Sequence, residues 1–229
     1  MVIAVDGPAG AGKSTVCRRL AQALGVAYLD TGAMYRAVAW ALAQCAMDQA
    51  SDQRMRQELP LLPLEFLIEA GRLRIDWEGS PLGDELRNPS ISRMASLVSQ
   101  RRPVRDFLTQ KQRALSRGHD VVAEGRDMTT VVFPDAELKV FLTASDRVRA
   151  ERRWKEYKEK GLSADLEDIL RQIQERDAAD SQRVLAPLKP GKDAIILDTS
   201  ELSIDQVVEQ LVRWAMEARE KALKREGSP

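Results

Sequence analysis

The clearest chemistry in this sequence lies in a glycine-rich segment near its start. The pattern G-x-x-x-x-G-K-[ST] is matched in full by Gly7-Pro8-Ala9-Gly10-Ala11-Gly12-Lys13-Ser14. Glycines let successive backbone N–H groups turn towards phosphate oxygens, lysine neutralises the terminal phosphates, and the serine hydroxyl is a ligand for Mg²⁺. We therefore predict that this segment, together with Thr15, binds a nucleoside triphosphate, with Lys13 on its terminal phosphates and Ser14 on Mg²⁺.

A second set of charged residues lies after predicted strands or on a predicted helix. Arg36 follows the second strand, and Arg126 follows the third, at the sheet edge where open α/β folds bind ligands. Arg176, Asp180 and Arg183 have the spacing of one helical face. We interpret these cations as groups for a second anion opposite the phosphate-binding segment.

The elements that would position these residues alternate between strands and helices. The strand before Gly7 leads into a helix over residues 14–24, and a second strand and helix follow to about Met47. This order predicts a three-layer α/β fold, in which helices cover both faces of a doubly wound, mostly parallel sheet of about five strands. Strands are expected at residues 2–5, 27–29, 120–124, 138–142 and 194–197, and further helices at 91–100, 104–117, 146–160, from about 162 to 180, and after Ser203.

Two other segments carry specific local signals. Residues 64–69 and 72–78 alternate in polarity around Gly71, which predicts an antiparallel hairpin inside an insert at about 61–87. Ser203 and Gln206 have the spacing of a capping box that opens the last helix, with Val207, Val208 and Leu211 facing inward.

Composition excludes several classes of protein. The chain has 229 residues, and its 35 Lys+Arg balance 35 Asp+Glu, which argues against a general nucleic-acid-binding role. Its two cysteines form no disulfide framework, and no apolar run approaches the ~20 residues of a membrane span. We expect a cytoplasmic protein with neither nucleic-acid nor membrane partners.

Five segments, spread over nearly the whole chain, carry a resemblance to a known family: residues 6–15, 29–36, 124–136, 175–177 and 186–188. The most specific of them is the run Gly125 to Ala136. On these segments the chain resembles the bacterial cytidylate kinases, within the nucleoside monophosphate kinase family.

The resemblance implies a phosphotransferase that converts ATP and CMP, or dCMP, into ADP and CDP, or dCDP, within pyrimidine metabolism. It assigns the Asp127 carboxylate to the amino group of cytosine, and Ser96 and Arg105 to the other base-reading positions. Asp180 matches the contact to the sugar. The positions around the CMP phosphate and the transferred group are Arg36, Arg126, Arg176 and Arg183, of which the last three are expected to be catalytic with Lys13.

The family's architecture implies one kinase domain over residues 1–229. Its core is expected at about 1–35, 118–145 and 190–225, its monophosphate-binding lobe, with the hairpin, at about 36–117, and a helical lid at about 146–185. Arg149 and Arg153 of the lid are expected to bind ATP, and lid closure would exclude water. Mg²⁺ bound with ATP is the expected cofactor, and a monomer is expected. Glu124 or Asp30 would either assist Mg²⁺ through water or orient an arginine.

Three alternatives remain open on the residues alone. One is a P-loop kinase with another acceptor, such as UMP, AMP or shikimate. A second is a nucleotide-dependent switch, although the guanine-reading tetrapeptide N-K-x-D does not occur. The third is a nucleic-acid-binding NTPase, which the neutral net charge disfavours but which a local basic face would still permit.

Overall fold

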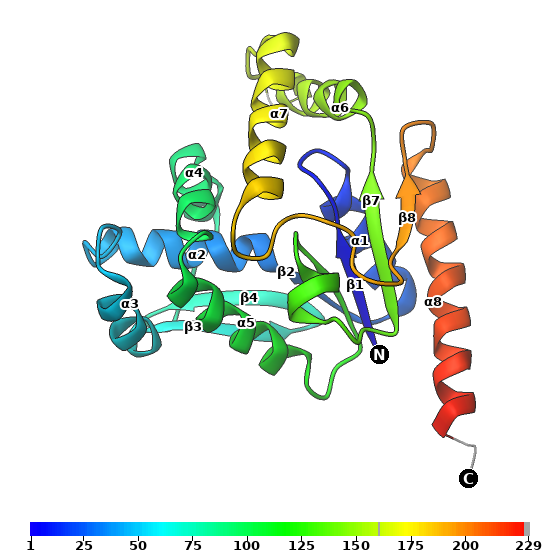
Figure 1. The fold of residues 1–229 in the computed structure, drawn as a ribbon, viewed down its shortest axis with the longest axis horizontal. Helices are drawn as coiled ribbons and strands as arrows, with labels where there is room; N and C mark the ends of the chain where they lie inside the picture. Colours follow the sequence, from blue (N-terminus) through cyan, green and yellow to red (C-terminus); the bar gives the residue numbers. More distant parts are fainter. Residues whose placement is uncertain (160, 227–229) are drawn as a thin grey trace. The chain divides into compact units, whose positions relative to one another are not determined.

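The chain folds into two compact bodies. The computed structural model describes residues 1–159 and 161–226, with helices and strands arranged as in Figure 1. The first body contains residues 1–25 and the chain from residue 122 onwards, and the second contains residues 26–121.

The first body is built on strands in the order β6-β1-β7-β8. β1 and β7 run parallel, with Ile3 opposite Leu138, and β7 and β8 run parallel, with Val140 opposite Ile195. Every second residue of β7 is buried, as a strand with one face on the core requires. The predicted α/β class is confirmed. The strands are β1 (Val2–Asp6), β6 (Val121–Glu124), β7 (Leu138–Thr143) and β8 (Ile195–Asp198).

The helices of this body begin and end close to the predicted boundaries. Gly25 ends α1 in the left-handed conformation, which glycine adopts without steric strain. The capping box before α8 is confirmed, because the Ser203 N–H donates to Gln206 Oε1 and the Gln206 N–H donates to Ser203 Oγ. Lys160 of the predicted helix 146–160 lies outside the described residues. The helices are α1 (Lys13–Leu24), α6 (Asp146–Glu159), α7 (Leu166–Gln182) and α8 (Ile204–Glu226), with a π-helical turn at Met128–Val132.

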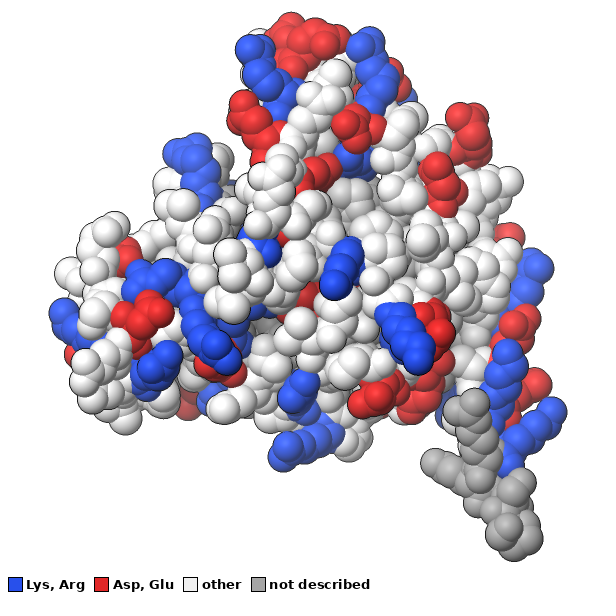
Figure 2. Space-filling model, in the orientation of Figure 1, with Lys and Arg blue, Asp and Glu red and all other residues white. Residues whose placement is uncertain are grey.

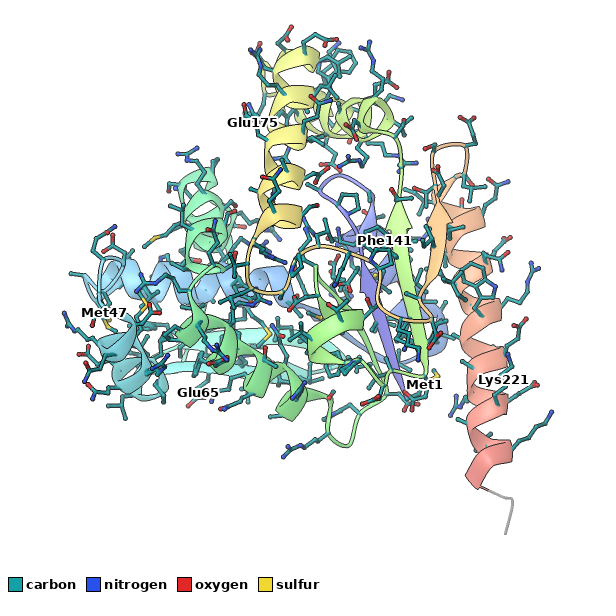
Figure 3. The ribbon with its side chains drawn as sticks, viewed as in Figure 1. Met1, Met47, Glu65, Phe141, Glu175 and Lys221 are labelled. Atoms are coloured by element: carbon teal, nitrogen blue, oxygen red, sulfur yellow. The ribbon has the colours of Figure 1, made fainter. Side chains whose placement is uncertain are left out.

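Helices α6 and α7 form a pair with a small apolar core of its own. Ala150, Ile169 and Ile173 are buried between them, and Trp154 and Leu170 pack around this core. Figure 3 shows the side chains of the two helices meeting in this space. The charged residues of α6 therefore project from a helix whose other side is fixed by packing.

The second body contains the predicted hairpin. β3 and β4 pair antiparallel, with Leu64 opposite Trp77 and Glu69 opposite Arg72, as expected. β4 also pairs parallel with β2, and the Tyr28 N–H donates to the Gly71 carbonyl over 3.0 Å. The hairpin thus extends the sheet beside β2. The strands are β2 (Ala27–Asp30), β3 (Leu64–Glu69), β4 (Arg72–Trp77) and β5 (Ser80–Pro81).

Four helices complete the second body, and one of them was not predicted. Helix α3 is short and polar; Ser51 caps it, and only Met55 of its residues is buried. Helix α2 packs on α4, and α3 packs on α5. The helices are α2 (Thr31–Gln44), α3 (Asp52–Glu58), α4 (Pro89–Val98) and α5 (Arg102–Ser116), with short 3₁₀ turns at Leu59–Leu61 and Asp84–Arg87.

Charged side chains of both signs are interspersed on the surface seen in Figure 2. This mixing agrees with the formal net charge of +0. Across residues 1–159 and 161–226, no helix has the length and apolar character needed to cross a bilayer.

Candidate active site

The glycine-rich segment joins β1 to α1, which is the context that the motif requires. Gly10 and Gly12 have φ angles of 77° and 80°, in the left-handed region that favours glycine. A Cβ atom on Gly7 would lie 2.0 Å from the carbonyl oxygen of Leu142, so only glycine fits there. No side chain caps α1, which leaves the positive end of the helix facing the loop.

Lys13 is held inside this loop. Its side chain is buried, and its ammonium donates to the Pro8 carbonyl over 2.8 Å. The pKa of Lys13 is lowered to about 7, chiefly by burial and next by the like charge of Arg126, while the carboxylate of Glu124 opposes the shift. A phosphate beside the ammonium would favour the charged form.

Two of the predicted catalytic arginines lie close enough to Lys13 to lower its pKa. Arg126 and Arg176 both act on Lys13 as like charges, which repel one another unless an anion lies between them. Glu124, the last residue of β6, is the carboxylate that acts on Lys13 with the opposite sign. The arrangement suits a group with spread negative charge, such as a phosphoryl group in transfer.

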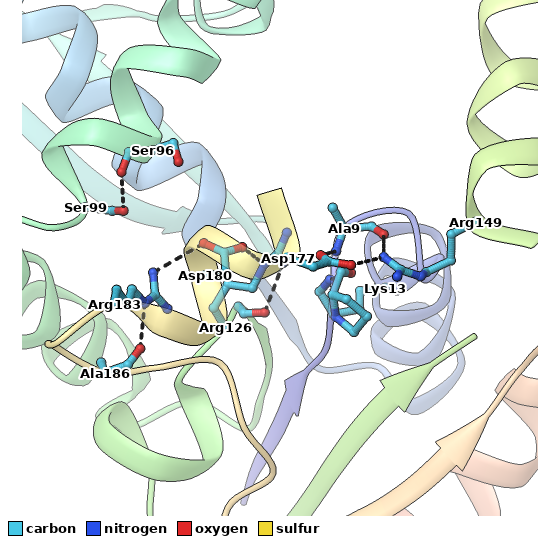
Figure 4. A network of polar contacts seen from close by, with 12 residues as sticks. Ala9, Lys13, Ser96, Ser99, Arg126, Arg149, Asp177, Asp180, Arg183 and Ala186 are labelled. Carbon is cyan, nitrogen blue, oxygen red and sulfur yellow. Dashed lines mark hydrogen bonds and ion pairs between the residues drawn. The ribbon is translucent and has the colours of Figure 1, made fainter. Parts of the chain in front are cut away.

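Asp180 links two of the predicted site arginines (Figure 4). Arg126 Nε donates to Asp180 Oδ2 over 3.0 Å, and Arg183 Nη1 lies 3.6 Å from Asp180 Oδ1. Both oxygens of this carboxylate therefore face a guanidinium. Asp180 therefore holds both guanidinium groups in position.

The structure corrects the predicted placement of Arg183. The spacing of Arg176, Asp180 and Arg183 predicted one helical face, but α7 ends at Gln182 and Arg183 has an extended backbone. The chain turns back here: the Leu188 N–H donates to the Asp180 carbonyl, and Arg183 Nε donates to the Ala186 carbonyl over 2.6 Å. Local contacts in the segment that follows the helix, which the helical spacing does not encode, set the position of this guanidinium.

Asp127 is buried at the start of the π-helical turn. This turn is anchored to Asp6, which accepts hydrogen bonds from the Met128 N–H, the Thr129 N–H and Thr129 Oγ1 at 2.7–2.8 Å. Burial is the main cause that raises the pKa of Asp6. The Gly191 N–H donates to Thr129 Oγ1 from a third segment. Asp6 thus positions the backbone beside Asp127, a role that the sequence patterns did not reveal.

Arg149 and Arg153, the predicted ATP-binding residues of α6, have different surroundings. Arg149 is buried, and it donates to the Ala9 carbonyl over 2.7 Å and to the Ala144 carbonyl over 3.0 Å. Arg153 is part-buried and donates to the Tyr157 hydroxyl. The side chain of Arg149 therefore contacts the backbone of the phosphate-binding segment, at the Ala9 carbonyl.

Asp177 is a site residue to which the sequence assigned no role. Its Oδ1 accepts from the Ala9 N–H over 3.2 Å, and its Oδ2 pairs with Arg149 Nη1 at 2.5 Å. The available signal was its place beside Arg176 in the run Glu175-Arg176-Asp177. Asp177 and Ala9 are 168 positions apart in the chain, so no periodic pattern in the sequence predicts their contact.

Ser14 has the properties that a magnesium site of this kind needs. Its side chain is exposed in the first turn of α1, directly after Lys13. Mg²⁺ prefers oxygen ligands, and in phosphate sites it takes one or two of them from the protein and the rest from phosphates and water. The hydroxyl of Ser14 fits an ion that arrives with a nucleotide.

In the second body, Asp30 orients Arg36. Asp30 ends β2, and its Oδ1 accepts from the Ala33 N–H over 2.9 Å, which caps α2. Its Oδ2 accepts from Arg36 Nη2 over 3.2 Å. Of the two roles left open for Asp30, the geometry fits the orientation of an arginine.

The other two predicted base-reading residues lie near one another in this body. Arg105 is buried on α5; it donates to the Ser99 carbonyl over 3.1 Å and stacks over the Tyr35 ring at 5.9 Å. Ser99 Oγ in turn donates to the Ser96 carbonyl over 2.8 Å. Segments from α2, α4 and α5 thus meet around Arg105.

Comparison with known proteins shows a likeness over nearly the whole chain. The model of the cytidylate kinase family matches residues 3–217. A cytidylate kinase of Thermosipho melanesiensis is 46% identical over 94% of this chain and 96% of its own length. One from Pseudomonas aeruginosa is 45% identical over 93% of each chain, and one from Serratia proteamaculans is 41% identical over 94% of each.

Proposed function

Because this chain belongs to the cytidylate kinase family, we propose that it transfers the γ-phosphoryl group of ATP to CMP or dCMP, giving ADP and CDP or dCDP. The observation that carries the proposal is the cluster in the first body, where Lys13 lies within electrostatic reach of Arg126 and Arg176. Phosphoryl transfer needs positioning and cations more than covalent catalysis, and this cluster supplies both.

On the donor side, the loop of residues 7–15 would enclose the phosphates of ATP, and Ser14 would hold Mg²⁺. Magnesium supplies further charge neutralisation on the phosphate oxygens when it is bound. Lys13 would exchange the Pro8 carbonyl for a phosphate oxygen. Its buried position removes competing water and strengthens that contact.

On the acceptor side, Arg126, Arg176 and Arg183 would hold the CMP phosphate and the group in transfer, and Asp180 would contact the sugar while it keeps Arg126 in place. Asp127 would accept from the amino group of cytosine, which uracil replaces with a carbonyl. Arg36, Ser96 and Arg105 of the second body complete the set that we assign to CMP.

The proposal keeps one kinase domain with three parts: a core, a monophosphate-binding lobe at about 36–117 and a lid at about 146–185. The packed pair of α6 and α7 supports the lid assignment, because it is held by a core of its own. We retain Arg149 and Arg153 as ATP-side residues. We also predict that the protein acts as a monomer in the cytoplasm, within pyrimidine metabolism.

The test is ADP release with Mg·ATP and, separately, CMP, dCMP, UMP, AMP, GMP and shikimate. We expect strong turnover with CMP and dCMP only. Lys13→Ala should lower kcat/KM by about a hundredfold or more, and Asp127→Ala should lower the preference for CMP over UMP by about tenfold or more. If another acceptor is preferred, or none raises ADP release above the ATP-only rate, the proposal is wrong.

A matched pair of variants on α7 separates the site from the surface. Arg176→Ala removes a cation that acts on Lys13, whereas Arg171→Ala removes an exposed one that pairs with Asp168. We expect Arg176→Ala to lower kcat by about a hundredfold and Arg171→Ala to leave it within about twofold. Equal effects would contradict the assignment of Arg176.

A further inference from the structure

The backbone N–H and the backbone carbonyl of Ala9 are both held by one pair of side chains. The Ala9 N–H donates to Asp177 Oδ1 over 3.2 Å, and the Ala9 carbonyl accepts from Arg149 Nη1 over 2.7 Å. The two side chains also pair with each other, Arg149 Nη1 to Asp177 Oδ2 at 2.5 Å. Figure 4 shows the resulting ring of Ala9, Arg149 and Asp177, which we call the Ala9 clamp.

The clamp is shielded from water and anchored on two helices. The side chains of Arg149 and Asp177 are 4% and 19% exposed, so their attraction is screened less than that of a surface pair. Arg149 Nη2 also pairs with Asp146, whose other oxygen accepts from Gln174 on α7. Packing between α6 and α7 therefore fixes the position of the Ala9 clamp on the phosphate-binding loop.

The clamp determines which groups of the loop are available to a phosphate. The Ala9 N–H already donates to a carboxylate, which would repel a phosphate at the same position. The choice of residue at position 10 is also limited by Arg149, because a Cβ atom on Gly10 would lie 3.1 Å from Arg149 Cβ. Ala9 thus serves the shape of the loop, and this shape aims the N–H groups from Gly10 to Ser14.

We propose that Asp177 is a positioning residue: through Ala9 and Arg149 it sets the backbone of the phosphate-binding loop and thereby the affinity for Mg·ATP. This inference rests on the proposed function for the identity of the nucleotide. The inference assigns Asp177 to the binding of ATP, whereas the adjacent residue Arg176 is proposed to hold the CMP phosphate and the group in transfer.

The first measurement is Mg·ATP affinity by calorimetry, without any acceptor. Asp177→Ala removes both contacts and should raise the Kd for Mg·ATP by about tenfold or more. Asp177→Asn keeps an acceptor for the Ala9 N–H but loses the charge that pairs with Arg149, so an intermediate loss is expected. The control is Asp168→Ala on the same helix, whose partner Arg171 is exposed, and it should leave the Kd within about twofold.

Steady-state kinetics separate positioning from a general loss of structure. The KM for ATP should rise in both Asp177 variants, while the KM for CMP stays within about twofold of the wild-type value. Arg149→Met combined with Asp177→Ala should lose less than the two single losses added together, since both act through Ala9. If Asp177→Ala does not fold, Asp177→Asn and Arg149→Met carry the same comparison.

Three results would overturn the inference: an unchanged Kd for Mg·ATP, a parallel rise in the constants for ATP and CMP, or tighter ATP binding after removal of the carboxylate. The last would mean that Asp177 competes with phosphate for the Ala9 N–H. Failure of the wild type to phosphorylate CMP would count against the proposed function alone, because ATP binding is measured separately.

Discussion

Arg126 and Asp180 form an ion pair at 3.0 Å although 54 positions separate them in the chain. Their side chains are 20% and 11% exposed, so the pair is largely shielded from solvent. It connects the segment that follows β6 to the last turn of α7. A predicted catalytic cation is thus oriented by a residue that the family resemblance assigns to the sugar.

This pair gives the first prediction. Asp180→Asn keeps the size of the side chain but removes the charge that faces Arg126 and Arg183. We expect kcat/KM for CMP to fall by about tenfold or more and the free energy of unfolding to fall by about 2 kcal/mol. Urea denaturation and ADP-release assays measure the two effects. The control is Asp168→Asn, and an equal loss in both variants would contradict the role of Asp180.

The lowered pKa of Lys13 predicts proton uptake on ATP binding. The pKa is about 7 in the free protein, and adjacent phosphates raise it. ATP affinity should therefore increase as pH falls from about 9 to about 7, and level off below the free-state pKa. Calorimetry at about pH 8 in two buffers of different ionisation enthalpy measures the protons taken up.

The matched control for that experiment is Lys13→Arg. Arginine keeps its charge over the whole pH range, so this variant should bind ATP without the proton uptake. Equal heats in both buffers for the wild type would show that Lys13 takes up no proton when ATP binds, and would contradict the prediction.

Gly191 tests the anchoring of the turn beside Asp127. A Cβ atom there would lie 2.3 Å from the carbonyl oxygen of Thr129, and the contacted atom is backbone. Gly191→Ala should lower the free energy of unfolding by about 2–3 kcal/mol. Gly83→Ala is the control, because its Cβ would meet only Glu85 Oε2, at 3.8 Å. A shift of the urea midpoint that is similar in both variants would argue against the close contact at Thr129.

Gln112 offers a stabilising substitution. Its side chain is fully buried on α5, and its amide oxygen and nitrogen have no hydrogen-bond partner among the described residues. Because an unsatisfied buried amide is costly, Gln112→Met should raise the free energy of unfolding by about 1 kcal/mol. Gln110→Met, on the exposed side of α5, should change it by less than about 0.5 kcal/mol. Destabilisation by Gln112→Met would mean that the amide has a partner in solution.

The sequence predicted elements whose signals are local. The capping box of Ser203 and Gln206 is reciprocal in the structure, and the predicted inward residues of α8 are buried. The hairpin of β3 and β4 follows from alternating polarity around a glycine. Helix α3 was missed because a single buried residue, Met55, leaves no periodicity to detect.

Site residues were predictable where the motif itself carries the chemistry, as in Lys13. They were not predictable where a contact joins distant segments. Asp6 anchors a turn 122 positions away, and Asp177 reaches residue 9 from α7. Neither relation has a period or a fixed spacing, since each depends on how the sheet and helices bring the segments together.

The separation between Ala9 and Asp177 has a consequence for synthesis on the ribosome. The two residues are 168 positions apart, so their contact belongs to the long-range class that forms slowly. A nascent chain contains the glycine-rich segment early, yet it cannot complete the Ala9 clamp until α7 has emerged. The glycine-rich segment, although it is synthesised before α7, therefore reaches its final conformation only after α7 has emerged.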